Sequence, residues 1–249
     1  MIMGDQLIRT RMLIGDEPIE RLKQAKIAVF GVGGVGGYCI EALARAGIGA
    51  MDLYDDDTVS ESNLNRQIAA LHSTIGQPKA EVLANRVKDI NPQCEVRAIR
   101  MFYLPENADM VNFTQYDYVI DCIDTVTAKL DLVQRCTNLQ VPVISAMGSG
   151  NKLDPSAFVV TDITKTEGCP LARIMRKELR KRGVNHLKVV YSKELPLSPI
   201  QPAQAEVPAG TDTRPGTTAR KDTPGSISFV PAAAGLLLAS AVVRDIGQF

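Results

Sequence analysis

The chain has 249 residues, which is enough for one large α/β domain with a sizeable core. Hydrophobic residues make up 45% and charged residues 22%, as is usual for a globular protein in water. Lys+Arg and Asp+Glu balance at 28 each, so the composition argues against a protein that binds nucleic acid mainly through bulk charge. A local basic patch remains compatible with it.

The cysteines and the apolar segments exclude further classes of protein. Five cysteines are scattered without a C-x-x-C pair, and the chain has only two histidines, so we predict neither a zinc site nor a disulfide scaffold. The N-terminus lacks a secretory signal pattern. The most apolar stretch, 227–243, is short for a bilayer span and contains Pro231 and Gly235. We therefore predict a buried helix there and a cytoplasmic protein.

Residues 25–150 alternate between apolar strands and amphipathic helices, after a polar, partly helical arm over 1–24. The predicted strands are 25–30, 50–54, 95–103, 117–120 and 141–146, and the predicted helices include 36–46 and 79–90. Such alternation is typical of a Rossmann-like, doubly wound and mostly parallel sheet.

The pattern changes over residues 151–249. We predict strands at 157–163, 188–192 and 226–230, a basic helix at 171–181, and a final helix whose first turn holds Pro231. The proline-rich segment 195–225 is expected to be a long flexible loop. We interpret this half as an extension of the same sheet by a few antiparallel strands and a C-terminal helix, so that 1–249 form a single domain.

A glycine-rich turn joins the first predicted strand to the first helix of the sheet. Gly31, Gly33, Gly34 and Gly36 let the backbone approach phosphates closely, and the helix N-terminus adds unpaired N–H groups. The turn alone fits a nicotinamide or flavin as readily as ATP. Asp55 ends the second strand, where a carboxylate accepts hydrogen bonds from ribose hydroxyls.

Three further groups favour ATP over a hydride-transfer cofactor. Arg66 lies in Ser62–Gln67, and Lys79 begins a helix, so a pair of cations near the phosphates would stabilise charge that develops during nucleotidyl transfer. Asp124 follows the fourth strand, where a carboxylate can hold Mg²⁺ on phosphate oxygens. Hydride transfer needs none of these groups.

The motifs taken together resemble the adenylating enzymes related to ubiquitin E1, typified by the activators of molybdopterin and thiamine sulfur carriers. The resemblance rests on G-x-G-G-x-G at 31–36, D-x-D-x-V-x-x-S-N-L-x-R-Q at 55–67, G-Q-P-K at 76–79 and D-C-x-D at 121–124. It implies an ATP- and Mg²⁺-dependent enzyme that converts a carboxylate to an acyl-adenylate.

The same resemblance implies roles for individual residues. Asp55 would bind ribose, while Asn63, Arg66 and Lys79 would contact phosphates and the transition state. Asp124 would act at Mg²⁺–ATP and at the acceptor carboxylate. The nucleotide site would be completed by Asp57, Gln67 and Asp121. Arg11 is similar to an arginine that dimers of this family insert into the neighbouring subunit's site, which implies a homodimer.

The second half is similar to a narrower subgroup, the bacterial tRNA threonylcarbamoyladenosine dehydratases. The similarity is carried by Ala42–Ala50, Ile90–Pro92, Gly148–Gly150, Leu153–Pro155, Val160–Thr166 and Pro170–Ala172. It implies that the carboxylate of threonylcarbamoyladenosine at tRNA position 37 is adenylated. An internal nucleophile of the modified base would then displace AMP and close a ring, with net loss of water and no need for an enzymic nucleophile.

Alternative functions stay open at this point. A protein that activates a ubiquitin-like sulfur carrier would share the ATP site, and a sulfur-transfer partner is then possible. The absence of zinc cysteines and the weak setting of Cys169 as a nucleophile argue against it. A non-catalytic nucleotide-binding protein and a nicotinamide oxidoreductase are further alternatives. Arg173, Arg176, Lys177 and Arg180 share one helix face and form either a tRNA contact or a solvated surface.

Overall fold

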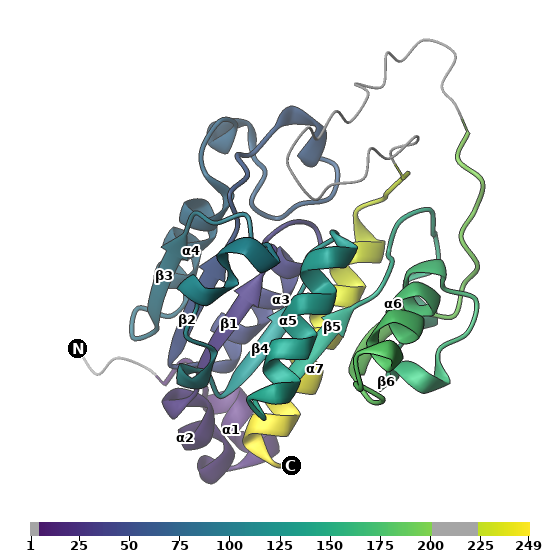
Figure 1. Ribbon diagram of the computed structural model, residues 1–249. Coiled ribbons are helices and arrows are strands. Elements are labelled where there is room, and N and C mark those ends of the chain that lie inside the picture. Colours follow the sequence, from purple (N-terminus) through teal and green to yellow (C-terminus); the bar gives the residue numbers. More distant parts are fainter. Residues whose placement is uncertain (1–4, 201–223) are drawn as a thin grey trace.

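A computed structural model describes residues 5–200 and 224–249, and Figure 1 shows its sheet flanked by helices. Seven strands form one sheet in the order β3-β2-β1-β4-β5-β7-β6. The strands are β1 (Lys26–Phe30), β2 (Ala50–Tyr54), β3 (Glu95–Ile99), β4 (Tyr118–Asp121), β5 (Val143–Ala146), β6 (Phe158–Asp162) and β7 (Lys188–Ser192). The predicted fold class, a doubly wound and mostly parallel sheet with an extension, is confirmed.

Strand pairing follows the hydrophobic pattern. The central strands β1, β2 and β4 are buried on both faces, as parallel strands covered by helices must be. All neighbours from β3 to β7 pair in parallel, and β6 alone among the described strands runs antiparallel, on β7. The strand predicted over 95–103 ends at Ile99, because residues 100–104 leave the sheet edge to form a loop.

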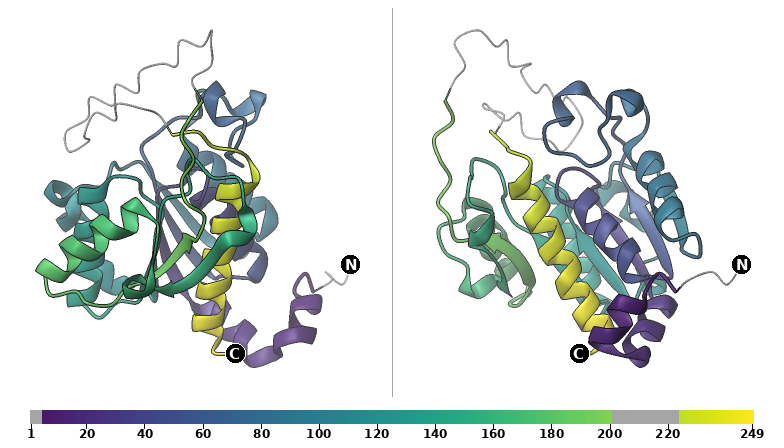
Figure 2. Two further views of the ribbon diagram at one scale, coloured as in Figure 1. Left: turned by 90° about the vertical axis from the view of Figure 1, so that its right-hand side faces the viewer. Right: turned by 180° about the vertical axis from the view of Figure 1, so that it is seen from behind.

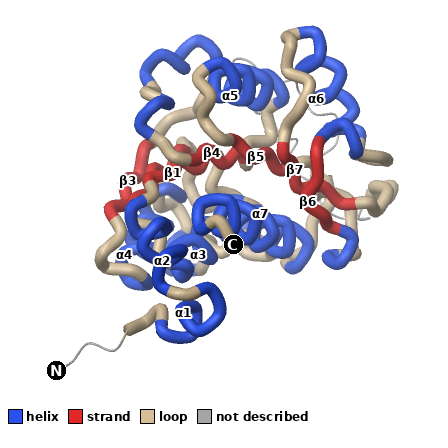
Figure 3. The backbone as a smooth tube through the Cα atoms, turned by 90° about the horizontal axis from the view of Figure 1, so that it is seen from below, coloured by secondary structure: helices blue, strands red, loops and turns tan. Residues whose placement is uncertain are grey.

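Helices cover both faces of the sheet (Figure 3). One face carries α2 (Asp16–Gln24), α3 (Gly36–Ala46), α4 (Lys79–Ile90) and α7 (Phe229–Gly247). The other face carries α5 (Val126–Asn138) and α6 (Pro170–Lys181), and α1 (Ile8–Ile14) projects from the arm beside α2. Buried apolar side chains form clusters on each side of the sheet, so both layers are held by hydrophobic burial.

The C-terminal helix corrects one prediction. No strand forms over 226–230: the chain is irregular from 224 to 228, and α7 begins at Phe229, which places Pro231 in its first turn. Ala234, Leu238 and Val242 recur at helical spacing and are buried, and this spacing overrides the short apolar run that suggested a strand. Most of the loop predicted over 195–225 lies outside the described residues.

The sequence predicted that this helix is buried, and the structure buries one of its sides. By length and composition α7 could cross a membrane, and 44% of its most apolar window is buried within the protein. It lies along the sheet and packs beside α3, as the right-hand view of Figure 2 shows. The apolar residues of α7 therefore belong to the core layer that supports the glycine turn ahead of α3.

Candidate functional site

A pocket of about 640 Å³ opens at the carboxyl ends of the parallel strands. Strand order reverses between β1 and β4, and open α/β sheets bind ligands in the crevice that this reversal creates. Register brings the strand ends together, because Phe30 pairs with both Tyr54 and Asp121. The segment after β2, drawn in blue in Figure 1, arches beyond this end of the sheet.

The glycine turn is shaped by two close approaches. Gly31 has φ +84°, and a Cβ there would stand 2.7 Å from the carbonyl oxygen of Cys122. A Cβ on Gly36 would lie 1.9 Å from the Gly31 carbonyl oxygen, so no other residue allows this turn. Gly33 and Gly34 line the pocket in front of the first turn of α3, whose N–H groups can bind phosphate.

Asp55, which follows β2, and Lys79, which begins α4, both line the pocket. The Asp55 carboxylate accepts hydrogen bonds from the backbone N–H of Val32 (2.8 Å) and of Asp57 (2.9 Å), and so ties β2 to the glycine turn. Burial raises the pKa of Asp55 above its ordinary value. The Lys79 ammonium, which is almost buried, donates to Asp57 at 2.9 Å. Asp57 thus orients a cation at the pocket wall.

Arg66 and Gln67 come from the segment that follows the short helix Glu61–Asn63. The Arg66 guanidinium donates to the Ser62 carbonyl oxygen and to Asn65 Oδ1, both at 2.9 Å, and burial lowers its pKa. Gln67 lines the pocket, and its Oε1 is the single buried side-chain polar atom without a hydrogen-bond partner in the described part of the chain. The Gln67 side-chain amide lies beside Gly33, and its unpartnered oxygen fits a site that a polar ligand completes.

Asp121, at the end of β4, supports the site from inside the core. Its carboxylate is fully buried, forms an ion pair with the equally buried Lys129 at 2.9 Å, and accepts hydrogen bonds from Ser145 Oγ and the Ile123 N–H. Lys129 also donates to the Ile123 carbonyl oxygen at 2.9 Å. These bonds fix the turn between β4 and α5 that carries Asp124, which is exposed and lines the pocket.

Nine of the predicted site residues line this one pocket: Gly31, Gly33, Gly34, Asp55, Asp57, Arg66, Gln67, Lys79 and Asp124. Gly36 lies beneath the turn. Asp121 was predicted to contact the nucleotide, but it is buried in the core and instead supports the turn that carries Asp124. The Asn63 side chain accepts from the Ser60 N–H and caps its short helix, again outside the pocket wall.

Arg11 does not reach the pocket of its own chain. It lies in α1 and pairs with Asp5 and Asp16 within the arm. Figure 1 places α1 at the end of the sheet opposite the glycine turn. Its predicted contact with a neighbouring subunit therefore stays a prediction.

Several pocket residues were missed from the sequence. Phe30, Tyr54 and Tyr103 form an aromatic wall, with Phe30 and Tyr54 stacked at 4.3 Å between ring centroids. The far end of the pocket is formed by residues 146–150, 152, 169–171, 196 and 224–226, among them Lys152. A polar residue shortly after the fifth strand was a possible signal for Lys152, since carboxyl ends of parallel strands share one edge.

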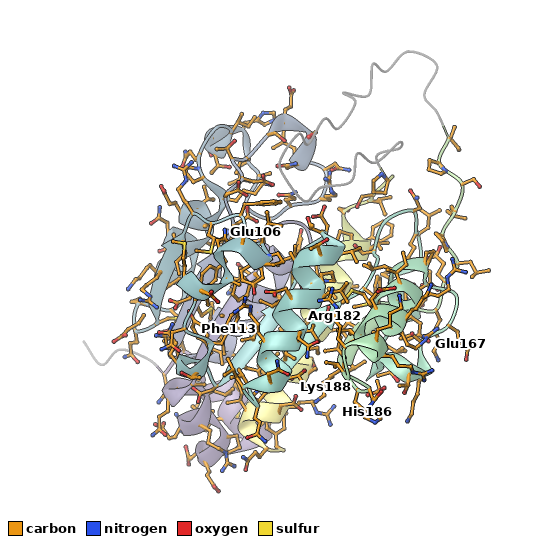
Figure 4. The ribbon with its side chains drawn as sticks, in the orientation of Figure 1. Glu106, Phe113, Glu167, Arg182, His186 and Lys188 are labelled. Atoms are coloured by element: carbon orange, nitrogen blue, oxygen red, sulfur yellow. The ribbon has the colours of Figure 1, made fainter. Side chains whose placement is uncertain are left out.

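The exposed basic face of α6 holds three of the four residues predicted for it, because Arg176 is not part of it. Arg176 turns inward and donates from Nη1 to the carbonyl oxygens of Ile163 (3.1 Å) and Thr166 (2.9 Å) and to the Thr166 hydroxyl, so it ties α6 to the preceding loop. Arg173, Lys177 and Arg180 remain exposed. Figure 4 shows Arg182 and His186 beside α6, on the side of the molecule away from β3.

The sequence of this chain is similar to those of known proteins along most of its length. The model of the ThiF family matches residues 7–249. A tRNA threonylcarbamoyladenosine dehydratase of Bacillus subtilis is 43% identical over 245 residues, which cover 98% of this chain and 95% of the relative. The corresponding Escherichia coli protein is 42% identical over 171 residues, covering 69% of this chain and 64% of the relative.

A solved structure extends the likeness to three dimensions. The Escherichia coli tRNA N6-threonylcarbamoyladenosine dehydratase in complex with ATP superposes with a TM-score of 0.82 at 32% identity, covering 99% of this chain and 97% of that one. The family match spans nearly the whole chain, from the N-terminal arm through the C-terminal helix. The chain therefore belongs to the ThiF family.

Proposed function

We propose that this chain is an ATP-dependent tRNA threonylcarbamoyladenosine dehydratase that works as one adenylating domain. The observation that carries the proposal is the convergence of the glycine turn, Asp55, Arg66, Lys79 and Asp124 on a single pocket. The near full-length similarity to proteins of that name supports the same substrate. Function as a cytoplasmic homodimer, with Arg11 reaching the neighbouring subunit, is part of the proposal.

The first half-reaction is carboxylate adenylation. A carboxylate oxygen of the threonylcarbamoyl group attacks the α-phosphorus of ATP, forming an acyl–O–P bond while the bond to pyrophosphate breaks. The N–H groups before α3 and the cations of Arg66 and Lys79 stabilise the negative charge that grows on the phosphoryl oxygens. In this proposal Asp55 holds the ribose, and the wall of Phe30 and Tyr54 offers an apolar surface to adenine.

Mg²⁺ fits the donor chemistry of this end of the pocket. Carboxylates are the ligands that Mg²⁺ prefers, and Asp124 lines the pocket on the turn after β4, which packs against Gly31. Asp124 would hold the ion, which when bound neutralises charge on the phosphate oxygens.

The second half-reaction closes the ring. A nucleophile within the modified nucleoside attacks the activated carbonyl carbon, and AMP leaves with the former carboxylate oxygen. The nucleoside thereby loses the elements of one water molecule, and ATP becomes AMP and pyrophosphate. Because the attack is intramolecular, its high effective molarity makes a covalent enzyme intermediate unnecessary.

A product assay tests the proposal directly. The protein is incubated with ATP, Mg²⁺ and tRNA that carries threonylcarbamoyladenosine, and the nucleosides are analysed by mass spectrometry. We expect a nucleoside lighter by one water, with one AMP formed for each product. Formation of an adenylate on a ubiquitin-like sulfur carrier, with unchanged tRNA, would instead support the alternative function and a sulfur-transfer partner.

Cys169 provides a test of the proposed chemistry. It is buried at the far end of the pocket. If cyclisation is intramolecular, Cys169→Ala keeps turnover within a few-fold of wild type. Single-turnover product formation measures this, and loss of product with ATP binding intact would indicate a thioester intermediate.

The exposed residues of α6 are proposed to contact tRNA phosphates. The double variant Arg173→Glu/Lys177→Glu should bind tRNA about tenfold or more weakly and reduce the slope of log affinity against log salt by about two. Lys88→Glu is the matched control, because Lys88 is exposed on α4 at the opposite face of the sheet. If the double variant and the Lys88→Glu control weaken tRNA binding equally, the tRNA surface lies elsewhere.

A further inference from the structure

The end of the pocket away from the glycine turn is built around a buried lysine. Lys152 follows β5, is only 4% exposed, and lines the pocket. Its Nζ donates a hydrogen bond to the backbone carbonyl oxygen of Glu194. Burial lowers the pKa of Lys152 below its ordinary value, which reflects the cost of keeping an ammonium group out of water.

The nearby carboxylate does not neutralise this lysine by direct contact. The Glu194 side chain accepts hydrogen bonds from the backbone N–H groups of Leu153 (3.0 Å) and Asp154 (2.9 Å). Within residues 5–200 and 224–249, Lys152 has no carboxylate partner at ion-pair distance, and its one hydrogen bond goes to a carbonyl oxygen. An ammonium group has three donors, so this cation is prepared for an additional acceptor.

The distribution of charge along the pocket assigns that acceptor a sign. The nucleotide end of the pocket carries both acidic and basic side chains, namely Asp55, Asp57, Arg66 and Lys79. At the far end, Lys152 is the one charged side chain among the described lining residues of 146–150, 152, 169–171, 196 and 224–226. A buried cation in a cavity strongly favours an anionic ligand, because a counter-charge offsets its desolvation.

We infer that Lys152 binds the carboxylate that becomes adenylated and holds it facing the α-phosphate. The inference rests on the proposed function, since it assigns the acceptor end of the same pocket. A carboxylate and a polyphosphate repel each other, and a fixed cation beside the carboxylate reduces that repulsion during approach. Lys152 transfers no proton: one carboxylate oxygen forms the bond to phosphorus, and pyrophosphate leaves as described above.

A binding cycle tests this contact without relying on turnover. Wild type and Lys152→Gln are titrated, in the absence of ATP, with tRNA bearing threonylcarbamoyladenosine and with the same tRNA whose carboxylate is converted to the amide. Glutamine can keep the hydrogen bond to Glu194 but lacks the charge. We expect wild type to prefer the acid by about 10-fold or more, and Lys152→Gln to lose that preference.

Two variants act as controls in the same cycle. Lys152→Arg keeps a cation and should retain part of the preference, while Lys193→Met, which alters an exposed lysine next to Glu194, should retain all of it. ATP affinity and melting temperature should match wild type in each. A preference for the acid that survives in Lys152→Gln overturns the inference, as does a loss of ATP affinity equal to the loss of tRNA affinity.

A footprint on the wild-type protein gives an answer that does not depend on any variant folding. The nearly buried Lys152 amine faces the pocket, so its acetylation is expected to be slow in the free protein and slower still with acid-form tRNA than with the amide form, as read by peptide mass spectrometry. Equal protection contradicts the inference. Failure of the Lys152 inference is distinguishable from failure of the proposed function. If the proposed function is wrong, the wild-type protein forms no dehydrated nucleoside at all.

Discussion

Arg66→Ala is expected to lower the rate of AMP formation about 10²-fold or more, and Lys79→Ala should have an effect of similar size. Both cations line the pocket in front of the glycine turn and are partly or almost fully buried. In such a site each stabilises charge that develops on the phosphoryl oxygens more strongly than it would in water. The effect should appear in kcat rather than in ATP affinity, because the charge grows in the transition state.

Single-turnover formation of AMP with threonylcarbamoyladenosine-bearing tRNA measures this effect. Arg45→Ala is the matched control, since Arg45 lies on α3, is exposed and pairs with Glu41. Arg66→Lys should recover only part of the rate, because an ammonium group cannot reproduce the planar fork of guanidinium donors. Rates within a few-fold of wild type for both alanine variants would remove these cations from the mechanism.

Lys129→Met is expected to destabilise the protein by about 3–5 kcal/mol. The substitution leaves the Asp121 carboxylate buried without its cation, held only by Ser145 and by the Ile123 N–H. Urea unfolding should show a lower midpoint with an unchanged slope, which identifies a loss of stability rather than a change in the denatured state.

A second substitution separates the buried charge from packing. Asp121→Asn/Lys129→Met removes both charges, so it should recover much of the stability that the single variant loses. Turnover should stay low in both variants, because the bond from Lys129 to the Ile123 carbonyl oxygen no longer fixes the turn that carries Asp124. A loss below about 1 kcal/mol in the single variant would mean that the ion pair does not hold this turn.

The sequence by itself determined the alternation of strands and helices. The bounds of α3, α4, β2 and β7 agree with the predicted ones, because each has strong periodicity and clear stop signals such as Gly47 and Pro92. The sequence also predicted a shared site for the glycine turn, Asp55, Arg66, Lys79 and Asp124, and all of them line one pocket. Asp55 and Asp124 were recognisable because they follow strands, and Arg66 and Lys79 because of the motifs that hold them. The strand predicted at 226–230 failed because a short apolar run fits either a strand or a helix.

Only the tertiary structure decided which polar residues face the ligand and which face the core. Asp121 and Asp124 share one motif, yet the first is buried at the end of β4 in an ion pair with Lys129 and the second lines the pocket. Arg176 likewise leaves the basic face of α6 for carbonyl oxygens of the preceding loop. Lys152 gains its setting from Glu194, 42 positions later in the chain. Burial and hydrogen-bond partners arise from contacts between distant segments, which local patterns do not encode.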